Sequence, residues 1–441
     1  MSTRISSISL LAAAMLAMPA SAQLLGGVGQ TLGNTVGGLT RGLSPLGQNP
    51  DGRTVGSVAR AAVSRLDTVG GFAGDIGATS LSALRSERLA GLISTNRALL
   101  ERDGNGQPVR RGALVLIDPA PGDLAVAARL GFTIAADRTD IDLGLRLVTL
   151  AVPARMNVRK ALATLRGAVP SMNSDFDHIF EPAGGPLAPL LAAGLAGANS
   201  VAAPGKRIAM IDGGAANHPS LGRASIEQKG FSGPAAATGH GTAVASLLVG
   251  DQGPFHGAAR GASLFVADIY GGNPAAGSAS AIVAALGWAA SKRPSVITMS
   301  LVGPDNRALA AAVNALRRRG IAIVAAVGND GPAAPLSYPA SYLGVVAVTG
   351  VDGKGRALLE AGRASHVDFA APGADIAAAT PGGGYARVRG TSFAAPLAAA
   401  RLTALGSADR LAAEAVPGKG RVGRGIVCAT CGIAPKAVGA R

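Results

Sequence analysis

The stretch Arg207-Ile208-Ala209-Met210-Ile211 opens the part of the chain whose pattern decides the fold. It is apolar on both faces, and beyond it short apolar strands alternate with helical stretches. The elements expected after this strand are, in chain order, a helix at Ala243–Leu248, a strand at Ser263–Asp268, a helix at Ala279–Ser291, a strand at Val296–Ser300, a helix at Ala308–Arg318 and a strand at Ile321–Val327. This pattern predicts an α/β fold with a doubly wound, mostly parallel sheet and helices on both faces. In such sheets, ligands bind at the carboxyl ends of the strands.

Upstream of this region, residues 79–182 predict a helix followed by a small α+β unit. The helix is expected at Ser80–Glu101. The unit is expected to contain a strand at Ala113–Ile117, a helix at Gly122–Leu130, a strand at Leu145–Val152, a helix at Val158–Leu165 and a short strand at His178–Glu181. This β-α-β-α-β order suits a ferredoxin-like split fold. Residues 183–203, rich in Pro, Gly, Ala and Leu, indicate a linker to the region 204–405.

The first 22 residues have the features of a secretory signal peptide. Arg4 supplies a positive charge, Ile8–Met18 is an apolar run too short to span a membrane, and Ala20-Ser21-Ala22 is a cleavage site. We therefore expect a secreted or periplasmic protein without a membrane anchor. Residues 23–78 are Gly-rich, of low complexity and without a sustained period, so they are expected to be poorly ordered. Residues 406–441 are expected to form a basic C-terminal tail.

The formal charge of +15 raises the question of an acidic partner such as nucleic acid or an anionic membrane. Lys and Arg are scattered along the chain, however, and aromatic residues, which would stack on bases, make up only 3%. This favours a basic, soluble surface and no nucleic-acid partner. The two cysteines, Cys428 and Cys431, form a C-x-x-C pattern. With an export signal, the pattern favours a local disulfide or an incidental pair over redox chemistry.

Two side chains of catalytic type follow the first strand. Asp212 comes directly after it and precedes Gly213-Gly214, so its carboxylate is placed at the carboxyl edge of the sheet. Taken alone, Asp212 is better explained as a turn-forming residue. His240 stands between Gly239 and Gly241, just before an Ala/Val run that predicts a buried helix. A solvent-facing histidine at a helix start is a candidate base.

Two more candidates lie downstream. Ser392 is part of Gly390-Thr391-Ser392, a run of small residues that leads into an apolar helix at Phe393–Leu405. The free N–H groups and the dipole of a helix N-terminus suit a developing oxyanion, although a serine here is also a common N-cap. Asn329 follows the strand Ile321–Val327 through Gly328, again at a carboxyl edge, where its amide could donate to an oxyanion.

The conjunction of these segments, from about Lys206 to Leu405, resembles the subtilisin-like serine peptidases (subtilases). The order Asp, His, Ser is the subtilisin order. The segments that carry the resemblance are Ile211-Asp212-x-Gly214 with His218-Pro219, Gly239-His240-Gly241-Thr242, Gly328-Asn329, Gly390-Thr391-Ser392-x-Ala394-x-Pro396, Ser300-Leu301, Tyr338-Pro339-Ala340 and Ala371-Pro372-Gly373.

Three positions depart from the family pattern. Gly213 stands where the family usually has Thr or Ser, and His218 lies one residue closer to the aspartate than is usual. Val302 replaces the first glycine of the usual Ser-Leu-Gly-Gly strand. The catalytic region is also short, which suggests trimmed loops. We therefore assign no metal and no cofactor.

The resemblance implies a secreted serine endopeptidase that hydrolyses peptide bonds of polypeptide substrates. In this role Ser392 is the nucleophile, His240 is the general base and Asp212 orients His240. Asn329 and the Ser392 backbone N–H would bind the oxyanion.

The resemblance also implies how substrate is held and controlled. An extended substrate would pair with the strand formed by Ser300, Leu301, Val302 and Gly303, with Ala326 and Gly328 on the opposite wall. These walls carry no charge, which predicts an apolar residue before the scissile bond, although Asp330 near the rim could admit a basic one. The α+β unit at residues 112–182 would be a propeptide that assists folding, acts as an intramolecular inhibitor and is released by cutting within the linker.

Three alternatives belong to other classes. The first is a catalytically silent, subtilase-like binding or scaffold protein of the cell envelope, against which the complete triad argues. The second is a basic nucleic-acid or envelope-binding protein. The third is a peptidase of the Ser-Glu-Asp type, which is not favoured because His240 and Asn329 stand where that type has a Glu and an Asp.

Overall fold

The computed structural model of this chain describes residues 74–183 and 202–440. The expected export signal at residues 1–22, most of the Gly-rich segment 23–78 and most of the linker 183–203 therefore lie outside the described residues. Within the described ranges, no helix combines the length and hydropathy that crossing a bilayer requires.

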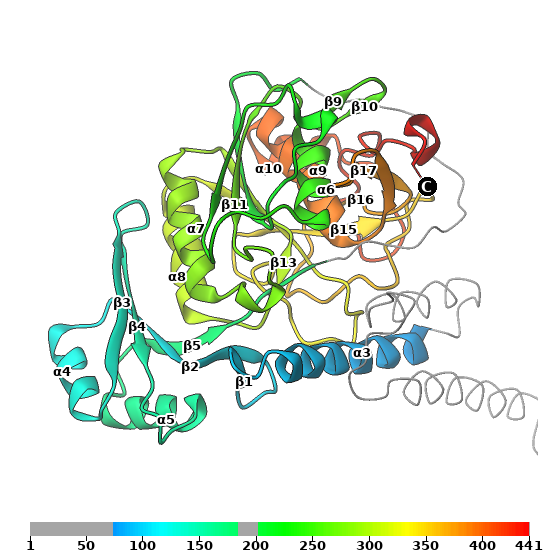
Figure 1. The fold of residues 1–441 in the computed structure, drawn as a ribbon. Coiled ribbons are helices and arrows are strands. Elements are labelled where there is room, and N and C mark those ends of the chain that lie inside the picture. Colours follow the sequence, from blue (N-terminus) through cyan, green and yellow to red (C-terminus); the bar gives the residue numbers. More distant parts are fainter. Residues whose placement is uncertain (1–73, 184–201, 441) are drawn as a thin grey trace, which may run out of the picture. The chain divides into compact units, whose positions relative to one another are not determined.

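A seven-stranded sheet forms the centre of the larger region (Figure 1). Its strands are β7 (Arg207–Asp212), β8 (Ile226–Gly230), β11 (Ser263–Asp268), β12 (Val296–Met299), β14 (Ala322–Ala326), β15 (Val346–Val351) and β16 (Phe369–Pro372). Their order is β16-β15-β14-β12-β7-β11-β8, and every neighbouring pair is parallel. Because strands are added on both sides of β7, the sheet is doubly wound, and the predicted α/β class is confirmed.

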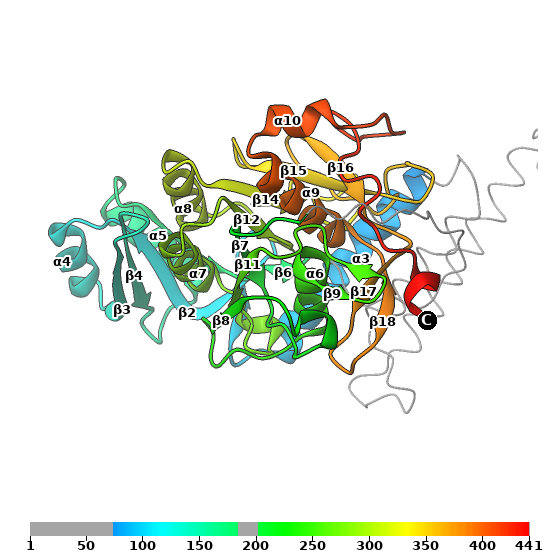
Figure 2. The ribbon, with the colours of Figure 1, turned by 90° about the horizontal axis from the view of Figure 1, so that it is seen from above.

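Helices cover both faces of this sheet, as Figure 2 shows. Along β7, Ile208 and Met210 pack into the cluster that contains α6 (Gly239–Val249) and α9 (Thr391–Leu405). The alternate residues Ala209 and Ile211 pack into the cluster that contains α7 (Ala279–Ser291) and α8 (Arg307–Arg318). Successive side chains of a strand point to opposite faces, so a strand that is apolar throughout is stable only between two helical layers.

Two helices begin earlier than the apolar pattern predicts. Helix α6 starts at Gly239 rather than Ala243, because the side chain of Thr238 accepts a hydrogen bond from the Gly241 N–H and caps the helix. Helix α9 starts at Thr391 rather than Phe393. As a result, His240 and Ser392 both lie in the first turn of a helix.

The region before the linker contains one strand more than expected. Its elements are α3 (Gly74–Thr95), β1 (Leu100–Arg102), β2 (Pro108–Ile117), α4 (Pro121–Arg129), β3 (Thr133–Asp140), β4 (Leu145–Ala151), α5 (Val158–Ala168), β5 (Ser174–His178) and β6 (Glu181–Pro182). From β2 to β5 the order is β-α-β-β-α-β, with antiparallel pairing in the order β5-β2-β4-β3. The expected β-α-β-α-β order was therefore wrong, although the split β-α-β arrangement is present.

The missed strand and the shifted helix have simple causes. β3 has hardly any buried residues, so its sequence lacks the alternation that marks a half-buried strand. Helix α3 begins at Gly74, inside the segment expected to be poorly ordered, and ends at Thr95 rather than Glu101. Leu100 belongs instead to β1, where it pairs with Arg110 of β2.

Shorter elements connect the main layers. They are the 3₁₀ turns η1 (Pro219–Leu221), η2 (Pro274–Ala276) and η3 (Pro435–Val438), the strands β9 (Asp251–Gln252), β10 (Phe255–His256), β13 (Leu301–Val302), β17 (Ile376–Ala379) and β18 (Tyr385–Val388), and helix α10 (Ala408–Ala413).

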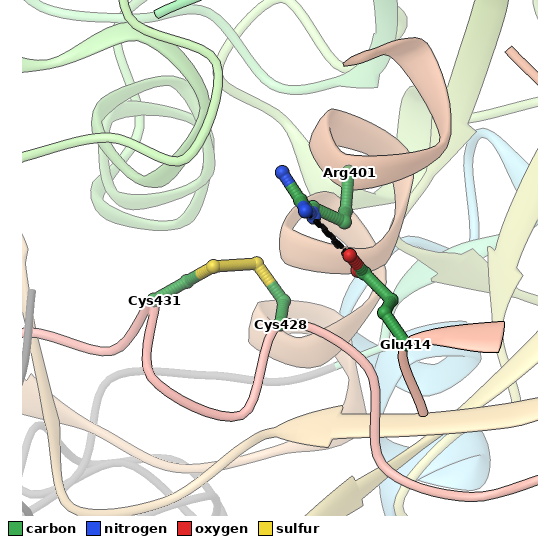
Figure 3. Close-up of a disulfide and its surroundings, with 4 residues drawn as sticks. All are labelled: Arg401, Glu414, Cys428 and Cys431. Carbon is green, nitrogen blue, oxygen red and sulfur yellow. Dashed lines mark hydrogen bonds and ion pairs between the residues drawn. A yellow bond between two sulfur atoms is a disulfide. The ribbon is translucent and has the colours of Figure 1, made fainter. Parts of the chain in front are cut away.

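The C-terminal segment is packed onto the sheet rather than free, which corrects the expectation of a tail. The Val427 N–H donates to the Ala370 carbonyl, and the Ala370 N–H donates to Gly425, so this segment pairs with the edge strand β16. Cys428 and Cys431 form a disulfide beside it, and Arg401 of α9 pairs with Glu414 (Figure 3). The segment thus covers a sheet edge that would otherwise expose unpaired backbone groups.

This packing predicts different outcomes for two valines of the same segment. Val427 is fully buried, whereas Val416 is 43% exposed. Val427→Ala should lower the free energy of unfolding by about 2 kcal/mol, because it leaves a cavity under the segment. Val416→Ala should lower it by less than about 0.5 kcal/mol. Guanidinium unfolding, with Ser392 replaced by Ala to suppress the expected peptidase activity, measures both. Equal effects would show that the segment does not pack on β16.

Candidate active site

A buried carboxylate and a histidine meet at the carboxyl edge of the sheet. Asp212 is the last residue of β7 and is 1% exposed. Its Oδ1 lies 2.8 Å from Nδ1 of His240 and 2.7 Å from the Gly213 nitrogen, whose N–H it accepts. Because a carboxylate only accepts, the histidine proton is held at Nδ1, and Nε2 is left as an acceptor.

Ser392 lies in the first turn of α9 and is fully buried. The ring of the following residue, Phe393, lies 5.3 Å from the His240 ring, centroid to centroid, so the first turns of α6 and α9 are in contact here. The Ser392 Oγ and the His240 Nε2 are both buried and without a hydrogen-bond partner among the described residues. Buried polar atoms are rarely left unpaired, and a catalytic role is one recognised explanation for such an exception.

The side chain of Asn329 is oriented by the start of α9. Its Oδ1 accepts a hydrogen bond from the Thr391 N–H at 2.9 Å, which leaves the amide Nδ2 free to donate. A Cβ placed on Gly390 would lie 2.9 Å from this Nδ2 and 3.5 Å from the Ser392 Oγ. The amide donor and the hydroxyl therefore border the same space, which stays open because residue 390 is a glycine with φ of +140°.

An extended segment of the α+β region before the linker pairs with the strand that was predicted to bind substrate. In the antiparallel pair β6–β13, Pro182 faces Leu301 and Glu181 faces Val302. The Ala183 N–H donates to the Ser300 carbonyl at 2.8 Å, and the Ser300 Oγ donates to the Ser392 carbonyl at 2.8 Å. The segment therefore ends beside the first turn of α9.

The other predicted binding residues are divided between cleft and core. Gly303 lies against the buried ring of Phe180, so closely that a Cβ would overlap it. Val302, Gly303 and Gly328 line one cavity together with Asp330. Ala326, by contrast, packs into the core cluster of α6 and α9. The structure thus brings Ser300 to Gly303 and Gly328 together around the bound segment.

The two departures around Asp212 are explained by their neighbours. A Cβ on Gly213 would overlap the side chain of Thr238, so the hydroxyl that the family usually carries at this position has no room here. Thr238 is the residue that caps α6. His218 is structural: its Nδ1 accepts from the Ser220 N–H, and its Nε2 bonds the Gly384 carbonyl at 2.9 Å.

Tyr270 adds to the electrostatics around Asp212. Burial raises the pKa of Tyr270 well above its usual value, and the negative charge of Asp212 acts in the same direction. The phenol therefore remains neutral. The Asp212 carboxylate can therefore stabilise the positive charge that develops on His240 when the imidazole takes up a proton.

Comparison with known proteins agrees with this geometry. The subtilase family model matches residues 204–414. Subtilisin Savinase from Lederbergia lenta is 34% identical over 198 residues, which is 44% of this chain and 72% of that protein. Thermitase from Thermoactinomyces vulgaris is 33% identical over 219 residues, 48% of this chain and 78% of that protein. The match to the alkaline protease of Alkalihalobacillus alcalophilus, also 34% identical, spans 51% of that protein.

A solved structure extends the likeness in fold. Fervidolysin from Fervidobacterium pennivorans, a keratinolytic enzyme related to subtilisin, aligns with a TM-score of 0.62 at 19% identity, over 77% of this chain and 63% of that chain. At this identity the likeness concerns the fold alone. The sequence matches lead to one conclusion: the chain belongs to the subtilase family of serine endopeptidases.

Proposed function

We propose that this protein is a secreted or periplasmic serine endopeptidase in which Asp212, His240 and Ser392 form the catalytic triad and Asn329 assists the oxyanion. The observation that carries the proposal is the buried Asp212–His240 hydrogen bond beside two unpaired atoms, the His240 Nε2 and the Ser392 Oγ. One of these atoms is a proton acceptor and the other is a proton donor. A nucleophile and its base need this complementarity.

The reaction then follows from the positions of these groups. The Ser392 Oγ attacks the substrate carbonyl, His240 Nε2 takes the Oγ proton, and the protonated His240 returns it to the leaving amine. Water hydrolyses the resulting acyl-enzyme through the same base, which restores the Ser392 hydroxyl. Asp212 stabilises the imidazolium in both steps, and the Asn329 Nδ2 with the Ser392 N–H receives the negative charge on the oxygen.

The nucleophile is tested by a single substitution. Ser392→Ala should abolish hydrolysis of a fluorogenic peptide and labelling by a fluorophosphonate, because no other group replaces the Oγ. Ser295→Ala, at an exposed serine, serves as the control and should keep both. Labelling that persists at another serine would contradict the assignment. A wild-type chain that neither turns over peptide nor labels would favour the silent binding protein instead.

The oxyanion role predicts a specific kinetic change. Asn329→Ala should lower kcat by about 10²–10³-fold with little change in KM, the usual effect of losing one preorganised oxyanion donor. Steady-state kinetics on one peptide measures this, and an unchanged melting temperature shows that the loss is not caused by unfolding. An unchanged kcat with a raised KM would mean that Asn329 only binds substrate.

We also propose that the small α+β region is a propeptide that inhibits the enzyme. Two carboxylates of β5 support this, because each caps a helix of the catalytic region. Asp177 accepts from the Ser280 N–H and hydroxyl at 2.9 and 2.8 Å, in the first turn of α7, and Asp175 accepts from the Arg307 N–H of α8 at 2.8 Å. Negative groups at helix N-termini are stabilising.

The second support is the segment in the cleft. The Phe180 N–H donates to the Gly277 carbonyl, and the Ala183 N–H donates to Ser300, so the segment is held from both sides as an added strand. A substrate would use the same backbone groups. While this segment is bound, it excludes substrate from the cleft.

This register predicts the processing point. Ala183 is the residue whose N–H reaches Ser300, next to Ser392, so the bond after Ala183 should be cut, at the start of the expected linker 183–203. Intact mass and N-terminal sequencing should show this cut in the wild type and not in Ser392→Ala, both made in a host without other secreted proteases.

Ala183→Pro provides a sharper test of the register, because it removes the N–H that donates to Ser300. It should slow the cut strongly, whereas Ala154→Pro, in the exposed turn before α5, should leave the cut in place. Equal cutting of wild type and Ser392→Ala would refute self-processing. Full activity of an uncut wild type would refute the inhibitory role.

A further inference from the structure

An ion-pair network joins helix α3 to the rim of the cleft. The Arg88 guanidinium donates to both carboxylate oxygens of Asp330, at 2.9 and 3.2 Å. It also donates to both oxygens of Glu181, each at 3.2 Å. Arg85, one helical turn earlier, places its Nε 3.2 Å from Asp330. Of these four residues, Asp330 alone belongs to the catalytic region.

Three of the four side chains are largely shielded from solvent: Asp330, Glu181 and Arg85 are 15%, 16% and 16% exposed, whereas Arg88 is 39% exposed. Two-pronged pairing of a guanidinium with a carboxylate is strong and directional, and shielded pairs are screened by salt less than exposed ones. Burial lowers the pKa of Arg88, but the charges and hydrogen bonds of Glu181 and Asp330 outweigh this, so that its pKa is raised. The rim of the cleft therefore holds a cation, the Arg88 guanidinium, between the carboxylates of Glu181 and Asp330.

The strand register defines which substrate position faces this cation. Glu181 pairs with Val302, two residues before Ala183, whose N–H reaches Ser300. A polypeptide substrate held by the same backbone bonds presents at this point the third residue before its scissile bond. In the structure, the Arg88 guanidinium alone spans the gap between the carboxylates of Glu181, at this position, and Asp330. A long cationic side chain at this position can place its own charge where that of Arg88 lies.

The cations that pair with Asp330 among the described residues come from α3, outside the catalytic region. Once the propeptide has left, the Asp330 carboxylate keeps neither of them. Arg363 lines the same cavity, but it is exposed, and solvent screens its charge. The other residues that the catalytic region contributes to this cavity are uncharged, among them Val302, Gly303, Val327 and Gly328, so Asp330 is left as its acidic group facing the bound strand.

We propose that Asp330 is a specificity-determining residue that binds a cationic side chain at the third residue before the scissile bond. Arg88 occupies this subsite in the unprocessed chain. The inference rests on the proposed function, because it requires an open and active cleft. It adds a charged subsite to the apolar walls expected beside the scissile bond.

Four peptides test this subsite on the self-processed enzyme. They carry Phe-X-Pro-Ala followed by a fluorogenic amide, which is the sequence of Phe180 to Ala183 with X, as Arg, Lys, Gln or Glu, at the position of Glu181. In the wild type, kcat/KM for the Arg peptide should exceed that for the Glu peptide by about tenfold or more, with Gln between them, since the Asp330 carboxylate attracts one charge and repels the other. The Arg-to-Glu ratio should fall as salt is raised to about 1 M, where the Debye length is about 3 Å.

Two variants locate the effect. Asp330→Asn should bring the Arg-to-Glu ratio close to one, whereas Asp409→Asn, at an exposed acid paired with Arg424, should keep it. If Asp330→Asn does not fold or process, the wild-type ratio and its salt dependence still decide. Equal cleavage of the four peptides by the wild type, or a ratio that survives in Asp330→Asn, overturns the inference and leaves the proposed function intact. No cleavage of any peptide overturns both.

Discussion

The parallel pairing of β7 with β11 on one side and β12 on the other is the constraint on which the rest of the structure depends. It buries β7 from Ile208 to Asp212, so helices must cover both faces of the sheet. It also places the carboxyl ends of the parallel strands along one edge. Asp212 ends β7 at this edge, and Asn329 follows β14 there. His240 and Ser392 lie in the first turns of α6 and α9, which are in contact through the rings of His240 and Phe393.

Sequence alone predicts this edge well, because its signals are local. A strand whose residues are all apolar indicates that both of its faces are buried, and a polar residue directly after it marks its carboxyl end. By this reasoning Asp212 and Asn329 could be placed at this edge, whereas His240 and Ser392 could be named from their position at helix starts and from the family resemblance. The four strands that were predicted in the central sheet, β7, β11, β12 and β14, end within one residue of the predicted positions, whereas β8, β15 and β16 were not predicted.

Features that depend on partners distant in the sequence could not be predicted in this way. Gly213 looks like a weakened family motif until Thr238 is seen to occupy the space of its missing side chain. None of the residues of strand β3 is buried, and the position of the strand is determined by its pairing with β4. The pairing of Arg88 with Asp330 joins residues 242 positions apart, and neither residue has a local signal that names the other.

Under the proposed inhibitory role, the same network would couple inhibition to the presence of α3. Glu181 lies in the strand that fills the cleft, and its carboxylate faces that of Asp330 with the Arg88 guanidinium between them. With Arg88 in place, the two acids are neutralised and the strand is held. Once α3 is withdrawn, two like charges share a partly shielded site, and this disfavours the bound strand. Glu181 would be a poor choice for a strand that had to bind by itself. Glu181 suits an inhibitory strand that stays in the cleft only while α3 supplies the Arg88 guanidinium, and that leaves the cleft when α3 is lost.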